Sequence, residues 1–163
     1  MPDPDVCNCG RGRPRARRHG VRHQSRGEQD KAFLDSSVIA AIFFKEEASV
    51  RALKRAEECD PVTLDLAIAE VGNVVWKRVS NSREDEGRAM DALRDCLEFI
   101  STACTLLESS DLLEEAFKIA VQDKISFYDS LFLAAAESER MPLLTLDKKL
   151  YERVKEKRDV RLV

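Results

Sequence analysis

The hydrophobic pattern of the chain changes its period repeatedly from residue 31 onward. Short apolar runs of strand length occur at Ala32–Asp35, Val62–Leu64, Thr102–Leu107, Pro142–Leu146 and Val160–Val163. Segments with helical spacing of apolar residues occur at Val38–Phe44, Glu46–Glu58, Leu66–Val79, Arg83–Ile100, Asp111–Gln122, Ser126–Ser138 and Lys148–Lys157. Strands that alternate with helices are typical of an α/β fold, in which helices cover both faces of a parallel sheet.

Residues 1–30 have a different composition. They contain prolines, glycines and the arginine-rich stretch Arg11–Arg18, carry a net charge of +3, and have almost no large apolar side chains. Such a segment buries too little apolar surface to fold, so we expect a disordered leader at 1–30 and one domain at 31–163. Three other interpretations stay open: a basic arm that contacts nucleic acid, an over-long start assignment with the true start near Val21, and a metal site. The residues of that metal site, whose spacing fits no standard zinc finger, would be Cys7, Cys9, His19 and His23.

Length and composition fit a single domain with an apolar core. The chain has 163 residues, 44% of them hydrophobic, and no apolar run long enough to cross a membrane. Its N-terminus has no apolar segment of signal-peptide length. Five cysteines, an odd number at irregular spacing, are typical of reduced thiols rather than of a disulfide framework. We therefore expect a cytoplasmic protein without membrane association.

Both histidines, His19 and His23, lie in the predicted leader. The domain at 31–163 then has no histidine for acid–base catalysis or for zinc. This argues against a two-histidine ribonuclease, a serine or cysteine hydrolase with a histidine base, and a histidine-bearing zinc site. The domain also has a net charge of −6, which disfavours nucleic-acid binding unless bound cations offset it.

Acidic residues stand at four places where an apolar run stops or turns. They are Asp35, Glu70, Asp129 and Asp147. Ligands of open α/β sheets bind outside the carboxyl ends of the strands, and Asp35 and Asp147 are predicted at such ends. Four carboxylates in one crevice would repel one another and would need cations to stay ionised. A cluster of carboxylates without histidine is typical of a Mg²⁺ or Mn²⁺ site.

Each of these acids also has a structural explanation. Asp35 and Asp147 precede predicted helices, where aspartate is a good N-cap. Asp129 lies three residues after Ser126, as in a capping box. Glu70 fits a solvated helix position, although helical spacing places it on a polar stripe of a mostly apolar helix. Only the combination of the four acids favours a metal site.

The segments that carry the four acids share features with one protein family. They read Phe33-Leu34-Asp35-Ser36-Ser37, Glu70-Val71-Gly72-Asn73, Tyr128-Asp129-Ser130-Leu131 and Leu144-Thr145-Leu146-Asp147. In this order and spacing they resemble PIN-domain nucleases, and among them the VapC-type toxins of prokaryotic toxin–antitoxin pairs. The resemblance covers about residues 31–163. It implies a PIN-like three-layer α/β/α fold with a short parallel sheet of about four to five strands.

The resemblance implies a Mg²⁺- or Mn²⁺-dependent endoribonuclease, the toxin of a toxin–antitoxin pair. Its catalytic residues and metal ligands would be Asp35, Glu70, Asp129 and Asp147. Supporting hydrogen bonds are expected from Ser36, Ser37, Asn73 and Thr145. Contacts to RNA phosphates are expected from Lys77, Lys148 and Lys149, for which a solvated surface position is the alternative. The implied partners are RNA, a VapB-type antitoxin and a second copy of the chain in a homodimer.

Two other function classes stay open. One is a phosphoryl-transfer protein: a phosphatase would need a second aspartate where Ser37 stands, and a response-regulator receiver would need adjacent early acids and a lysine after a late strand, neither of which is clear. A non-catalytic binding module on the same scaffold is the other class, and the presence of all four acids argues against it. The run Val38–Phe44 is apolar around its whole circumference, so either the domain buries it or a partner such as the antitoxin covers part of it.

Overall fold

The computed structural model of the chain describes residues 30–44 and 47–163. Within them lies one sheet of five parallel strands in the order β3-β2-β1-β4-β5. The strands are β1 (Lys31–Leu34), β2 (Asp60–Leu64), β3 (Thr105–Leu107), β4 (Leu143–Thr145) and β5 (Val160–Leu162). The predicted α/β class, the parallel sheet and the expected number of strands are therefore confirmed.

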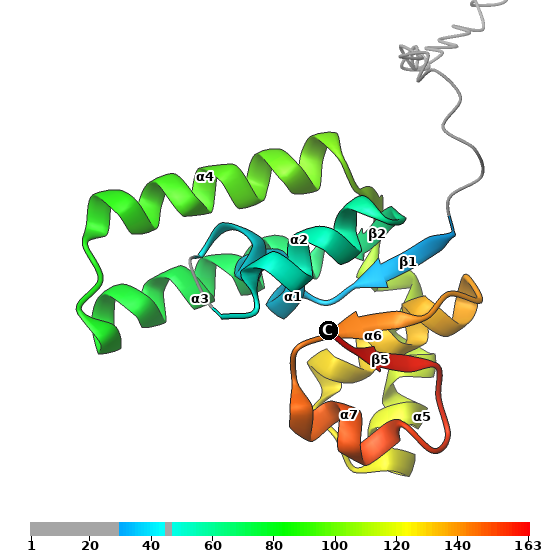
Figure 1. The fold of residues 1–163 in the computed structure, drawn as a ribbon. Coiled ribbons are helices and arrows are strands. Elements are labelled where there is room, and N and C mark those ends of the chain that lie inside the picture. The colour runs from blue at the N-terminus through cyan, green and yellow to red at the C-terminus, as the bar shows by residue number, and fades with distance from the viewer. Residues whose placement is uncertain (1–29, 45–46) are drawn as a thin grey trace, which may run out of the picture.

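Two groups of helices flank this sheet (Figure 1). The first group is α1 (Ser36–Phe43), α2 (Ser49–Glu57), α3 (Leu66–Ser82) and α4 (Glu86–Thr102). The second group is the 3₁₀ turn η1 (Ser109–Leu112) with α5 (Leu113–Asp123), α6 (Phe127–Ser138) and α7 (Lys148–Val154). Helix α6 packs against β1, β2 and β4, and α7 lies beside β5. Helices α3 and α4 form a long hairpin whose connection lies far from the sheet (Figure 1).

Element ends differ from the predicted ones at a few places for local reasons. The helix predicted from residue 83 begins only at Glu86, because Arg83 adopts a left-handed conformation that ends α3. The strand predicted from residue 102 shortens to β3, because α4 continues to Thr102. The predicted helix start at Asp111 lies in η1, and the last helix ends at Val154 rather than at residue 157. The start predicted at residue 46 lies outside the described residues.

The strand order reverses between β1 and β4. From β1 the chain crosses outward to β2 and β3, and it then returns to β4 and continues to β5. This connectivity places a topological switch point at the carboxyl ends of β1 and β4, where open α/β sheets bind ligands. Leu34 and Leu144 are paired in register. The next residues along the two strands, Asp35 and Thr145, are therefore neighbours at that edge of the sheet.

The apolar core joins the sheet to both helix groups. Phe33 of β1 and Phe132 of α6 pack edge to face with 6.4 Å between their ring centroids. Helix α1 contacts α2, α3 and α4, and Val38, Ile39 and Ala41 are almost completely buried. Burial inside the domain therefore accounts for most of the apolar run at 38–44, of which Ile42 and Phe43 are only partly buried.

Several expectations from composition concern the N-terminal segment. Residues 1–29 of the predicted leader, with the four residues of its candidate metal site, lie outside the described residues, which begin at residue 30. Across 30–44 and 47–163, each helix is too short or too polar to traverse a bilayer. The cysteines in these ranges are free thiols, namely Cys59, Cys96 and Cys104.

Candidate active site

Asp35 follows β1 directly, and hydroxyl groups hold its carboxylate. Thr145 Oγ1 donates to Asp35 Oδ2 at 2.6 Å, and Ser37 Oγ donates to the same oxygen at 2.7 Å. The backbone N–H of Ser37 approaches Oδ1 at 3.5 Å, so Asp35 is the N-cap of α1. The N-cap prediction is confirmed. It is compatible with a second role, because hydroxyl donors can rotate away when a cation approaches a carboxylate.

Asp147 follows β4 and caps α7 with one of its two carboxylate oxygens. Its Oδ1 accepts from the backbone N–H groups of Lys149 at 2.7 Å and Leu150 at 3.0 Å. The backbone of the same segment is tied to the neighbouring hydroxyls: Leu146 N–H donates to Ser37 Oγ at 3.1 Å. Asp147 N–H likewise donates to Thr145 Oγ1 at 3.0 Å. The ends of β1 and β4 therefore form one hydrogen-bonded unit.

Glu70 reaches this unit from α3. Ser36 Oγ donates to Glu70 Oε2 at 2.5 Å and also lies 3.2 Å from Asp35 Oδ1, so one hydroxyl joins the two acids. Burial raises the pKa of Glu70, and the charges of Asp35 and Asp129 raise it further. The hydrogen bond from Ser36 and the charge of Lys77 act in the opposite direction without cancelling the rise. The charged form of Glu70 is therefore disfavoured in the folded chain.

Asp129 lies in the first turn of α6. Its backbone N–H donates to Ser126 Oγ at 3.0 Å, which confirms the predicted cap. Burial raises the pKa of the Asp129 carboxyl, and the charges of Asp35 and Asp147 add to this, against hydrogen bonding with Ser126. Asp35 thus acts on both Glu70 and Asp129, while Asp147 acts on Asp129. All four predicted acids belong to one electrostatic cluster, which we call the acidic cluster.

The acidic cluster has no paired cation within the described residues. None of its four carboxylates forms an ion pair with an arginine or lysine in those ranges. Asp35, Glu70 and Asp129 are partly buried and Asp147 is exposed, and carboxylate oxygens of this kind are the ligands that a hard divalent cation prefers. No three Asp, Glu, Cys or His side chains of the described residues are arranged to hold an ion directly. An ion here would therefore keep water in part of its coordination shell, as Mg²⁺ usually does.

Most of the predicted supporting residues take part in this cluster. The ones that are hydrogen-bonded into it are Ser36, Ser37 and Thr145. Asn73 is exposed on α3, and in the described part of the chain Glu70 is hydrogen-bonded by Ser36 instead. The three lysines predicted to contact RNA, Lys77, Lys148 and Lys149, are all exposed. Lys148 and Lys149 are the first two residues of α7 and follow Asp147 directly.

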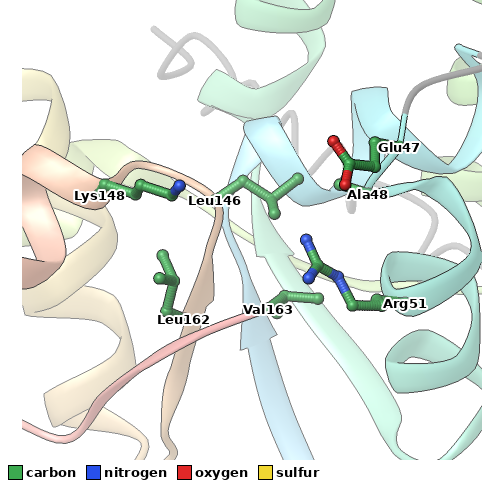
Figure 2. Close-up of a pocket in the computed structure, with 7 residues that line it drawn as sticks. All are labelled: Glu47, Ala48, Arg51, Leu146, Lys148, Leu162 and Val163. Atoms are coloured by element: carbon green, nitrogen blue, oxygen red, sulfur yellow. The ribbon is translucent and has the colours of Figure 1, made fainter.

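Two features of the site were not predicted from the sequence. One is the bridge that Ser36 forms to Glu70, which lies 34 residues away. The other is a cavity beside the acidic cluster, into which Arg51 of α2 and Lys148 of α7 both project (Figure 2). Arg51 belongs to no motif. The one sequence signal that could have identified it is its position on the exposed basic face of an amphipathic helix.

Comparisons with known proteins identify the family of this domain. A family model described as the PIN domain matches residues 32–157, which include all four acids. Ribonuclease VapC3 of Pyrobaculum aerophilum is 36% identical over 126 residues, which cover 76% of this chain and 94% of the relative. Exonuclease VapC9 of the same organism is 33% identical over 97 residues, which cover 60% of this chain and 69% of the relative. The crystal structure of PAE2754, also from Pyrobaculum aerophilum, is similar with a TM-score of 0.60 at 28% identity, covering 78% of this chain and 81% of the other.

Proposed function

The chain belongs to the PIN-domain family, and from this premise we propose that it is a metal-dependent endoribonuclease, the toxin of a VapBC-type toxin–antitoxin system. One observation carries the proposal: four carboxylates from separate segments meet at the switch point of the sheet without a paired cation among the described residues. RNA as the substrate is supported by the similarity to the relative named Ribonuclease VapC3.

The proposed catalytic residues and metal ligands are Asp35, Glu70, Asp129 and Asp147. When bound, Mg²⁺ or Mn²⁺ would lower the pKa of a bound water and offset charge on the phosphate oxygens. The chain itself contributes positioning. Ser37 and Thr145 fix the Asp35 carboxylate, and Ser36 orients Glu70 toward it. The raised pKa values of Glu70 and Asp129 indicate that a positive charge, from a proton or a metal ion, stabilises the cluster.

Cleavage assays test this function. The full chain should cut a single-stranded RNA when Mg²⁺ or Mn²⁺ is present and lose that activity in excess EDTA. A circular RNA separates endonuclease from exonuclease activity because it has no ends, and we expect it to be cut. A single-stranded DNA of the same sequence measures the preference for RNA. Activity that persists in EDTA would contradict metal dependence, and cleavage of linear RNA alone would contradict the endonuclease assignment.

We also propose a VapB-type antitoxin and a second copy of the chain as partners. Apolar side chains at helical spacing lie exposed along one face of α5, which supports a protein interface: Leu113, Phe117 and Val121. Co-expression with the product of an adjacent short gene, followed by light scattering and a cleavage assay, tests both partners. We expect an inhibited complex and a dimeric free toxin. A monomer that neither binds that product nor loses activity in its presence would leave a solitary nuclease.

A further inference from the structure

A cavity of ≈ 520 Å³ lies beside the acidic cluster (Figure 2). This volume is within the range of about 300–1,000 Å³ that is common for small-molecule sites. Its apolar lining comes from the end of β4 and from the end of β5, and its charged lining comes from α2, α7 and the segment before α2. The apolar residues are Leu146, Leu162 and Val163, with Ala48 from the segment before α2, and the charged ones are Arg51, Lys148 and Glu47.

Two cations reach into this cavity from opposite sides. Arg51 extends from α2 and Lys148 extends from α7 (Figure 2). Neither side chain has an ion-pair partner in the described part of the chain, whereas the next cations on α2, Lys54 and Arg55, both pair with Glu58. Among the side chains that line the cavity there are thus two unpaired cations and one acid, a set that suits a phosphate group.

The cavity and the acidic cluster share one segment of backbone. Leu146 and Lys148 line the cavity and flank Asp147 on both sides. The backbone N–H of Leu146 also donates to Ser37 Oγ, which in turn holds Asp35. A polymer that lies across the acidic cluster can therefore reach this cavity on the side of β5.

We propose that this cavity binds one nucleotide of the RNA next to the cleaved bond, and that it requires that nucleotide to be unpaired. The inference rests on the proposed function. Arg51 and Lys148 contact its phosphate, and the apolar side chains contact its base or ribose. A base in a duplex is stacked and cannot reach an apolar wall, whereas a single-stranded nucleotide can turn its face to one. The site therefore selects single-stranded RNA on this side of the cut.

Binding measurements with matched variants test the cavity. Each variant is made in the Asp129→Asn background, so that RNA is bound but not cleaved, and a fluorescent single-stranded RNA is titrated at several salt concentrations in Mg²⁺. Arg51→Gln and Lys148→Gln should each weaken binding roughly three- to tenfold and flatten the slope of log K against log salt by about 0.7. Glu47→Gln should strengthen binding, because it removes the one acid from the cavity.

The control is Arg88→Gln, an exposed cation in the first turn of α4, at the far end of the α3–α4 hairpin. It should change neither the affinity nor the salt slope. The proposal is overturned if the Arg51 and Lys148 variants bind like the control, or if they lose as much affinity for a blunt RNA duplex as for the single strand. It is also overturned if they bind RNA normally but lose an acidic protein partner.

The outcome for the proposed function is read separately, from wild-type cleavage with metal. If the cavity variants weaken RNA binding but the wild-type protein does not cleave RNA, the proposed function is refuted and the cavity proposal stands. If the wild-type protein cleaves RNA with metal but the Arg51 and Lys148 variants bind RNA like the control, the cavity proposal is refuted and the proposed function stands.

Discussion

The buried carboxylate of Asp123 and the partly buried carboxylates of the acidic cluster have opposite surroundings in this domain. At the amino end of β5, the side chain of Asp123 is fully buried and is paired with two cations. Lys157 Nζ lies 3.1 Å from Oδ1, and Arg158 Nε lies 2.6 Å from Oδ2. Arg158 also pairs with Glu137 of α6. Burial alone would raise the pKa of Asp123, but its hydrogen bonds and ion pairs with Arg158 and Lys157 lower it below the usual value.

The acidic cluster lies at the opposite, carboxyl end of the sheet. There burial raises the pKa of Glu70 and of Asp129, like charges add to the rise, and only hydroxyl and N–H donors hydrogen-bond the carboxylates in the described residues. The comparison shows that burial does not decide what a carboxylate does. With bound cations from the same chain, Asp123 fastens α5 to the segment before β5. The acidic cluster has no such cation among the described residues, which supports our proposal that it binds a cation from solution.

The largest effect that we expect is on catalysis, from a substitution in the acidic cluster. Asp129→Asn removes one charge from the acidic cluster with little change in shape, and it should lower metal-dependent RNA cleavage by about a hundredfold or more. Single-turnover cleavage rates in Mg²⁺ measure this. Asp91→Asn is the control, because Asp91 is exposed on α4 and pairs with the exposed Arg94. Full activity in Asp129→Asn would remove Asp129 from the site.

The next largest effect is on stability. Asp123→Asn leaves Arg158 buried without its full counter-charge, and it should lower the free energy of unfolding by about 3 kcal/mol. Urea denaturation measures this, and the variant should still cleave RNA below its melting temperature. Asp159→Asn, which breaks an exposed pair with Arg161, should change stability by less than about 0.5 kcal/mol. If the two substitutions lowered the free energy of unfolding equally, the buried ion pair of Asp123 would contribute no more to stability than the exposed pair of Asp159.

The sequence predicts the acidic cluster better than the paired one, and the reason is the range of the interactions. Asp35 and Asp147 follow apolar runs of strand length, so local pattern places them at strand ends, and the parallel topology brings the ends together. Asp123 follows the end of a predicted helix, and no sequence motif distinguishes it from a solvent-exposed acid. Its partners lie 34 and 35 residues further along the chain, where no local pattern marks them.

Asp65 shows that a local sequence pattern can also suggest a site where the structure has none. It follows β2 and precedes α3, so its local pattern is that of Asp35. In the structure its Oδ1 accepts the backbone N–H of Ser109 at 3.1 Å, and it anchors the segment after β3. That partner is 44 residues away. Only the three-dimensional neighbours separate an acid that closes a loop from one that faces the switch point.

A smaller effect is expected when Glu70 is neutralised without metal. Because its pKa is raised, the ionised form destabilises the fold, and Glu70→Gln should melt no lower than wild type in EDTA. In Mg²⁺ the wild type should gain more melting temperature than the variant, because the ion binds the charged cluster. Thermal melting in both buffers measures this, with Glu98→Gln as an exposed control on α4. A variant that melts far below wild type in EDTA would show that Glu70 is a structural acid like Asp123.

The smallest effects are in the pH dependence, where the two groups should have opposite signs. The pKa of Glu70 is raised above 4.5, so its contribution to stability is present below pH 4.5 and is lost as the pH rises through the folded value. The pKa of Asp123 is lowered below 3.8, so its contribution is present above pH 3.8 and is lost as the pH falls through the folded value. In EDTA, the advantage of Glu70→Gln over wild type should therefore grow from mildly acidic to neutral pH.

Over the same range, the advantage of wild type over Asp123→Asn should stay constant, and it should shrink only below pH 3.8. Urea denaturation of the three proteins from about pH 3 to pH 8 measures both trends. Repeating the series in Mg²⁺ should remove the first trend and leave the second. If the proposed function holds, the ion replaces the proton at the acidic cluster, whereas Asp123 is fully buried and already paired within the chain. Two trends that both persist in Mg²⁺ would mean that the cation does not bind at the acidic cluster.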